Sequence, residues 1–482
     1  MTGVGKKMAI GVRWSLVDKG GQQGITFLVF AVLARFVAPE DFGLVAMALL
    51  IIGFVQLFID QGFSTAIIQR ETLSDEMLST AFWTNIAIGM LLGAVLIALR
   101  DYAAWFFSEP RVAELIPWMA VALILEALMS VPQALLKRNF DFKGLALRTL
   151  YARLIAGVVA IGGAASGWGV WSLVAFTVLS GALSTAILWW ISDWRPGFRF
   201  SIAHFRGLFR FGGHVTGVRI MSYINSKALD VFIGYFFGAT ALGYYTLAMQ
   251  LVGRIGSVMV QVLSQVTMSG FSRLQADAEL LLKQLLAVTR LTSAVAFPVF
   301  ALLGAMAPDI VLLLYGSGWE RSAVLIGMLA PIGPAMVMSS VIGDAIMGAG
   351  RPHLIFRARI LATALLVASL LVARQFGADI MVLVFTMSFF VFGLPLYFVA
   401  AKRVLSLSVR SYSLQYSPAV LATAALLLTV FFVRSWVANV GAPLLEMAVT
   451  GCSAVTMYVL VLMGLDRRIM VDLRRVLLSG AA

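Results

Sequence analysis

The chain has 482 residues, of which 61% are hydrophobic and only 12% charged, and its mean hydropathy is +0.95. Soluble domains carry about a quarter charged residues, so this composition excludes a water-soluble globule and indicates a polytopic membrane protein. The formal net charge of +13 does not indicate nucleic-acid binding, because the basic residues lie in short segments between apolar runs. The single cysteine, Cys452, excludes an intramolecular disulfide.

Apolar segments recur along the whole chain, each long enough for the roughly 20 residues that a helix needs to cross a bilayer. Strand-like alternation is absent, so we expect an all-α membrane protein with about 14 transmembrane helices. The first span follows a basic segment without a cleavage site, so we expect it to stay in the membrane. The spans are expected near residues 14–36, 43–69, 78–99, 112–136, 145–166, 168–191, 211–236, 241–268, 284–306, 322–348, 354–374, 380–400, 418–436 and 444–464.

The basic residues are distributed unevenly between the two sides of these spans. Most of the 36 Lys and Arg residues fall on the side of the N-terminus. Because cytoplasmic loops carry the excess of Lys and Arg, we expect both termini to be cytoplasmic. Prolines 298, 331, 334 and 395 are expected to kink their helices.

An internal repeat divides the chain. A shift of 200 residues aligns six identical pairs and also Lys19 with Arg219; the pairs are Phe36/Phe236, Gly43/Gly243, Ala48/Ala248, Gly53/Gly253, Gln61/Gln261 and Ser64/Ser264. Six spans separate the copies, which predicts a pseudo-two-fold axis along the membrane normal. We expect two pseudo-symmetric six-helix lobes, residues 1–200 (helices 1–6) and 201–405 (helices 7–12), followed by two additional helices and a cytoplasmic tail in 406–482.

Polar residues recur at helical spacing through the seventh and eighth spans. The first stripe contains Arg219, Tyr223, Ser226, Lys227 and Asp230, and the second contains Gln250, Arg254, Ser257, Gln261 and Gln265. A cation deep in a bilayer needs a partner or a watery cavity, so we interpret these helices as a wall of an aqueous chamber. Lys227 and Asp230 are three residues apart and either neutralise each other or line the cavity. Arg219 and Arg254 have no carboxylate one turn away and are candidates to meet an anionic ligand.

The first span carries a second polar patch formed by Asp18, Lys19, Gln22, Gln23 and Thr26. Asp18 and Lys19 either snorkel to the cytoplasmic interface or join the glutamines in lining the cavity. Three carboxylates are candidates for ion coupling: Asp18, Asp60 and Asp230. Asp60 alternatively pairs with Lys19. Glu126, Arg153 and Asp344 are isolated charges for which structural roles are expected.

No motif for metal, nucleotide or covalent chemistry accompanies these residues. His204, His214 and His353 have no ligand spacing, and neither a P-loop nor a nucleophile with its base is present in the sequence. We therefore expect no metal, no cofactor and no enzymatic activity.

Several short motifs resemble those of the polysaccharide and oligosaccharide flippases of the MOP superfamily, the colanic-acid-exporter (lipopolysaccharide biosynthesis protein) type above all. The motifs are Arg13–Leu16, Ala34–Gly43, Asp60–Ser64, Gly238–Tyr245 and Ala349–Pro352. The resemblance covers nearly the whole chain. It implies translocation of undecaprenyl-diphosphate-linked oligosaccharide from the cytoplasmic to the periplasmic leaflet of the bacterial inner membrane, by alternating access, for exopolysaccharide assembly.

The resemblance also bears on substrate and partners. Related lipid II flippases receive the diphosphate in a cationic central cavity, a role that Lys19, Arg219, Lys227 and Arg254 fit by type and position, and their last two helices border a groove for the lipid tail. Tyr223, Gln22, Gln23, Gln250 and Gln261 are expected to line the cavity. Membrane lipids and polysaccharide polymerase and co-polymerase proteins are the expected partners.

Two other functions remain open at this point. A cation-coupled multidrug exporter of the same superfamily would favour carboxylates for cationic drugs, whereas basic residues predominate among the deep charges here. A membrane glycan polymerase or ligase would need catalytic groups outside the membrane, where the short loops offer only a few charged residues, among them Arg100, Glu109 and Arg111.

Overall fold

The computed structural model describes residues 3–59, 63–275, 277–437 and 443–466. Within these ranges the regular secondary structure is entirely helical, which confirms the predicted all-α polytopic fold. The chain forms two compact units, Met1–Thr246 and Leu247–Ala482. The predicted lobes 1–200, 201–405 and 406–482 stay a prediction.

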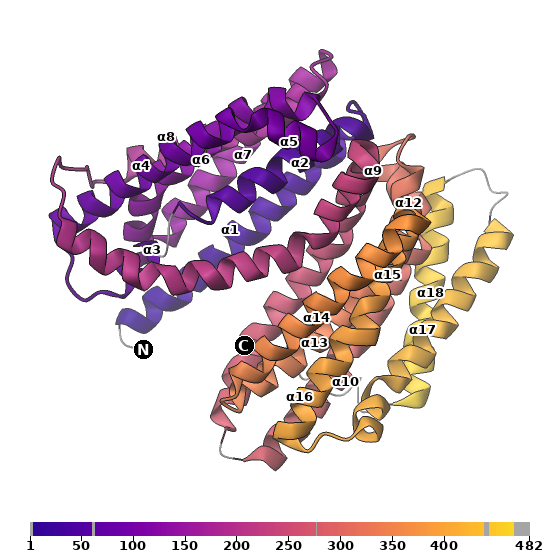
Figure 1. Ribbon diagram of the computed structural model, residues 1–482. Helices are drawn as coiled ribbons and strands as arrows, with labels where there is room; N and C mark the ends of the chain where they lie inside the picture. Colours follow the sequence, from indigo (N-terminus) through magenta and orange to yellow (C-terminus); the bar gives the residue numbers. More distant parts are fainter. Residues whose placement is uncertain (1–2, 60–62, 276, 438–442, 467–482) are drawn as a thin grey trace. The chain divides into compact units, whose positions relative to one another are not determined.

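The first unit consists of α1 to α8 and the beginning of α9 (Figure 1). Their bounds are α1 Gly3–Leu33, α2 Pro39–Gln56, α3 Phe63–Gln69, α4 Asp75–Ala98, α5 Arg100–Phe107, α6 Arg111–Arg138, α7 Phe142–Ala165, α8 Val170–Ile191 and α9 Ile202–Arg273. α7 packs against α1 and α8, and α6 packs against α4 and α8. Ser74 caps α4 by accepting a hydrogen bond from the Met77 amide at 3.2 Å, which satisfies one of the free amides of a helix N-terminus.

α9 is interrupted at Gly238. This residue has φ 79° and ψ −175°, a backbone conformation that glycine adopts without the steric cost of a Cβ atom. The helix therefore ends before Gly238 and starts again at Ala239, as the sequence predicts for the seventh and eighth spans. The division between the two units falls in the second part, at Thr246 and Leu247.

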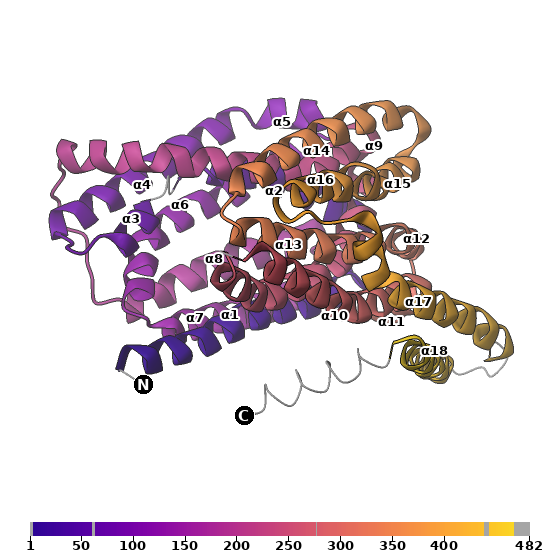
Figure 2. The same ribbon diagram turned by 90° about the horizontal axis from the view of Figure 1, so that it is seen from below.

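The second unit continues from α9 through α18 (Figures 1 and 2). Its helices are α10 Ala278–Ala305, α11 Ala307–Tyr315, α12 Glu320–Leu329, α13 Ile332–Gly348, α14 Pro352–Ala373, α15 Ala378–Ser388, α16 Leu394–Leu405, α17 Val409–Val437 and α18 Pro443–Leu465. α10 packs against α13 and α17, and α17 packs against α18. The Tyr458 hydroxyl of α18 donates a hydrogen bond to the Ala294 carbonyl of α10 at 2.8 Å, which ties the last two helices to this unit.

Twelve helical segments of the described residues are long and apolar enough to cross a membrane. One of them, Arg219–Ser264, overlaps both the seventh (211–236) and the eighth (241–268) predicted spans, which are separated at Gly238. α1 is not among the twelve, because its glycines, glutamines and charged residues lower its hydropathy. Two of the four prolines that are expected to kink their helices lie at irregular points. Pro331 lies where α12 ends and α13 begins, and Pro395 follows a π-helical turn, Phe389–Gly393.

Candidate functional site

The first unit contains a close crossing between the start of α2 and the second part of α9. A Cβ atom at Gly43 would lie 1.7 Å from the Ala239 carbonyl oxygen, and one at Gly243 would lie 1.8 Å from the Pro39 carbonyl oxygen. The two contacts exchange roles, since residues 39 and 43 correspond to 239 and 243 in the predicted repeat. Such reciprocity is the property of an isologous, two-fold contact. The repeat therefore has a physical counterpart, and both glycines are needed for the helices to touch.

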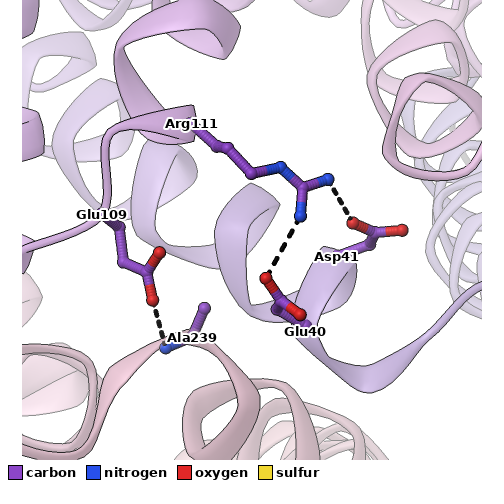
Figure 3. Close-up of polar contacts among 5 residues, drawn as sticks. All are labelled: Glu40, Asp41, Glu109, Arg111 and Ala239. Carbon is purple, nitrogen blue, oxygen red and sulfur yellow. Dashed lines mark hydrogen bonds and ion pairs between the residues drawn. The ribbon is translucent and has the colours of Figure 1, made fainter.

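The start of α6 and the connection that precedes it contact both helices of this crossing (Figure 3). Arg111 binds Glu40 at 3.1 Å and Asp41 at 2.8 Å, both in the first turn of α2. Glu109 Oε1 accepts a long hydrogen bond of 3.5 Å from the amide of Ala239. Because Gly238 breaks α9, this amide belongs to a new helix N-terminus, where negative charge is favourable.

The polar patch of α1 meets basic residues of α7. Asp18 Oδ1 accepts a hydrogen bond from Gln22 Nε2 at 2.8 Å, and the Arg153 guanidinium donates to the Thr26 hydroxyl. Arg148 is only 6% exposed and interacts electrostatically with Asp18 and with Glu126 of α6. Charges that are isolated in sequence are thus assembled into one network, which links α1 to α6 and α7.

The first part of α9 supplies an ion pair and a contact to α2. Lys227 Nζ lies 2.8 Å from Asp230 Oδ1, and Asp230 is buried. The two side chains therefore neutralise each other, the first of the two alternatives for this pair. The Tyr223 hydroxyl donates a hydrogen bond to the Leu50 carbonyl of α2 at 2.7 Å, and Arg219 is half-buried.

In the second unit, Arg254 extends along its own helix. Its NH2 group donates to Gln250 Oε1 at 3.3 Å. Burial raises the pKa of Tyr315, at the end of α11, to about 12, and the nearby positive charge of Arg254 acts in the opposite direction. Gln261 is half-buried. This part of α9 therefore carries a guanidinium group that is held by a hydrogen bond to the side-chain amide one turn before it.

A family model described as polysaccharide biosynthesis protein matches residues 32–324, more than half of the chain. The chain belongs to this family. The succinoglycan biosynthesis transport protein ExoT of Rhizobium meliloti is 26% identical over 351 residues, 73% of this chain and 71% of that protein. The lipopolysaccharide biosynthesis protein WzxC of Escherichia coli is 26% identical over 416 residues, 85% of this chain and 84% of that protein. The resemblance to polysaccharide biosynthesis proteins that the short motifs indicate is confirmed.

Solved structures share the fold. The lipid II flippase MurJ in an inward closed conformation superposes with a TM-score of 0.76 at 12% identity, over 95% of this chain and 100% of that chain. An inward-facing multidrug resistance MATE family transporter of the MOP superfamily gives 0.62 at 15% identity, over 80% of this chain and 95% of that chain. At these identities the likeness shows a common architecture of helices.

Within this polysaccharide biosynthesis protein, the residues predicted to form the site have different surroundings. Lys19 is exposed, whereas Gln22 and Gln23 are half-buried beside it on α1. Asp60 lies outside the described residues, as does the side chain of Gln265. The cavity role of these residues stays a prediction. Among the described residues, no three His, Cys, Asp or Glu side chains lie close enough together to hold a metal ion.

Glu109 and Arg111 are the contacts that sequence reasoning missed. They were noted only as charges of a short outer loop, and no helical periodicity distinguishes them. A usable signal was present in the acidic pair Glu40 and Asp41, which lies in the motif Ala34–Gly43 and carries negative charge that a basic side chain can bind. Two of the family motifs, Ala34–Gly43 and Gly238–Tyr245, meet at the crossing that this loop contacts.

Proposed function

We propose that this protein is a flippase that carries undecaprenyl-diphosphate-linked oligosaccharide from the cytoplasmic to the periplasmic leaflet of the bacterial inner membrane. The family and the activities named for its relatives support this class of activity: one relative is a transport protein of succinoglycan biosynthesis, and a structural neighbour is a lipid II flippase. The proposed activity is transport, with no chemical step on the glycan. Polysaccharide polymerase and co-polymerase proteins would use its product.

The reciprocal crossing of α2 and α9 is the observation that carries the proposed mechanism, alternating access. With both termini in the cytoplasm, as we propose, the starts of α2 and of the second part of α9 are at the periplasmic end. A substrate that leaves between these two helix starts is then blocked at the periplasmic end, because the helices touch at Gly43 and Gly243 without room for a side chain. Release of substrate to the periplasm requires these helix starts to separate, and Glu109 and Arg111 hold them from one loop.

The phosphates of the substrate supply the charge that basic residues would bind. We propose that Arg219 and Arg254 contact them, because a guanidinium binds phosphate oxygens bidentately. Lys19 is exposed and adds charge, whereas the pairing of Lys227 with Asp230 leaves that lysine a smaller part. The glutamines of α1 and α9 offer donors and acceptors to sugar hydroxyls.

The test uses Arg219→Ala and Arg254→Ala in a strain that lacks the native gene. We expect each variant to insert and accumulate normally but to lower surface glycan at least tenfold, with lipid-linked oligosaccharide accumulating in its place. The lysine variants at both positions are expected to recover part of the export, because a positive charge remains. Arg434→Ala is a matched control, since this exposed arginine near the end of α17 pairs with Asp309 of α11. Wild-type export in both alanine variants contradicts the cationic site.

A further inference from the structure

Six exposed basic side chains lie at one end of the second unit, at the beginning of α14, the end of α16 and the start of α17. We call them the basic cluster: Arg351, Arg357, Arg359, Lys402, Arg403 and Arg410. The three helix ends that carry them pack around one hydrophobic core, to which Leu354 of α14, Leu405 of α16 and Tyr412 of α17 contribute. The basic cluster is therefore a single surface region assembled from three helices.

No carboxylate neutralises the basic cluster. The sequence contains no Asp or Glu between Asp344 and Asp379, or between Asp379 and Glu446. Within the part of the chain that the structure describes, none of the six side chains forms an ion pair. Unpaired positive charges of one sign on one surface attract anions from outside the protein.

The opposite end of the same helices has a different charge balance. Arg321 lies 2.6 Å from Asp379, which follows α14, and Arg434 near the end of α17 lies 3.1 Å from Asp309. Both α14 and α17 are long and apolar enough to cross a membrane. The uncompensated charge is thus separated from these ion pairs by the length of a membrane-spanning helix. The topology rule requires an excess of Lys and Arg in loops, but it does not require them to be assembled around one core.

Large apolar side chains are exposed next to the basic cluster. Phe356 and Leu361 lie beside its arginines on α14, Val399 precedes Lys402 on α16, and Val409 begins α17. A water-soluble acidic protein would cover the charges and leave these apolar groups exposed. A ligand that has both a negatively charged headgroup and hydrocarbon chains matches both kinds of side chain.

We propose that the basic cluster binds the headgroups of anionic phospholipids at the membrane surface. A guanidinium binds phosphate oxygens bidentately, and an ammonium adds a compact positive charge. Basic sites between membrane-spanning helices recur as headgroup sites. With both termini in the cytoplasm, as proposed above, the bound lipid belongs to the cytoplasmic leaflet. It contacts α14, α16 and α17 together, so it stabilises the packing of their ends.

The experiment measures thermal unfolding of the purified full-length protein in a neutral detergent, titrated with phosphatidylglycerol or with phosphatidylcholine that has the same acyl chains. A ligand that binds only the folded state raises the unfolding temperature as its concentration increases. We expect a saturable rise with phosphatidylglycerol that exceeds the rise with phosphatidylcholine and that high salt reduces. An equal rise with the two lipids overturns the proposal and favours an acidic protein as the partner of the basic cluster.

A pair of substitutions on α14 locates the site. Arg357→Gln together with Arg359→Gln is expected to raise the phosphatidylglycerol concentration at half-maximal effect by about fivefold or more. Lysine at both positions is expected to keep most of the response, because the charge remains. Arg321→Gln together with Arg434→Gln is the matched control, since it removes two positive charges at the opposite end and is expected to respond as the wild type does.

Lys402→Gln together with Arg403→Gln protects the test against a folding defect in α14. This pair lies in the last turn of α16 and is expected to weaken the response to phosphatidylglycerol in the same direction. A full response in both the α14 and the α16 variants overturns the proposed site, because the lipid then binds elsewhere. No glycan substrate is used, so failure of the flippase assignment leaves this result unchanged.

Discussion

Ser64 and Ser264 occupy equivalent positions in the repeat, yet their hydroxyls have different partners. In the first unit, Ser64 contacts the Ser130 carbonyl at 3.4 Å, and the Ser130 hydroxyl accepts from the buried Asn85 at 2.7 Å. In the second unit, Ser264 donates to the carboxylate of Asp344. The repeated serine therefore keeps a polar contact between helices in both units, although its partner is a backbone carbonyl in the first unit and a side-chain carboxyl group in the second.

The largest effects are expected where the two copies have stayed identical, at the crossing glycines. Gly43→Ala and Gly243→Ala place a methyl group within 2 Å of a backbone oxygen, so the helices must move apart. We expect each to lower the free energy of unfolding by about 3 kcal/mol, measured by thermal unfolding. Gly93→Ala on α4, where nothing lies within 4 Å, is the control and is expected to be neutral or stabilising. Equal stability of all three variants would contradict the close contact between α2 and α9.

A smaller effect is expected from placing a buried carboxylate beside Ser130 in the first unit. Asn85 is fully buried, and Asn85→Asp introduces a carboxylate with a single hydroxyl partner, Ser130. We expect a loss of about 2–3 kcal/mol in unfolding free energy. The same substitution at the exposed Asn139 is the control and is expected to cost less than about 1 kcal/mol. A variant as stable as the wild type would show that the first unit tolerates a buried carboxylate at this position.

The smallest effect on stability is expected at the charged loop that contacts the crossing. Arg111 is about half exposed, with side-chain exposure of 46%, and such ion pairs contribute about 1 kcal/mol or less. A double-mutant cycle of Arg111→Gln and Asp41→Asn should give a coupling energy in that range, reduced by salt. Under alternating access, the same variants should change export more than they change unfolding. A coupling energy above about 2 kcal/mol would contradict this expectation and would show that the ion pair contributes mainly to the stability of the fold.

Local patterns predicted much of the fold. Apolar spans of sufficient length predicted the helices, and the break at Gly238 falls in the gap expected between the seventh and eighth spans. Lys227 and Asp230 pair because three residues bring side chains to one helical face. The repeat, read from a few identities, correctly associated Gly43 with Gly243, although the sequence did not indicate that each contacts the other copy's backbone.

Contacts between distant helices were not predictable in the same way. Asp344 was expected to be an isolated charge, since its hydroxyl partners on α9 lie far away in sequence. Arg148 is buried beside Asp18 and Glu126, and no spacing in the sequence indicates this contact. The glutamine stripe of α1 was recognised, whereas its basic partners on α7 were not. Such pairings depend on tertiary packing, which leaves no period in the sequence.

The most direct test of the proposed function uses purified protein in proteoliposomes that contain a lipid-diphosphate-linked oligosaccharide. The measurement is the fraction of substrate that a membrane-impermeant glycosidase, added outside, can cleave over time. We expect the wild-type protein to make the inner-leaflet pool accessible within the assay, and Arg219→Ala together with Arg254→Ala to leave about half of the substrate protected, as in empty liposomes. Protection that is the same with and without the wild-type protein contradicts the flippase account.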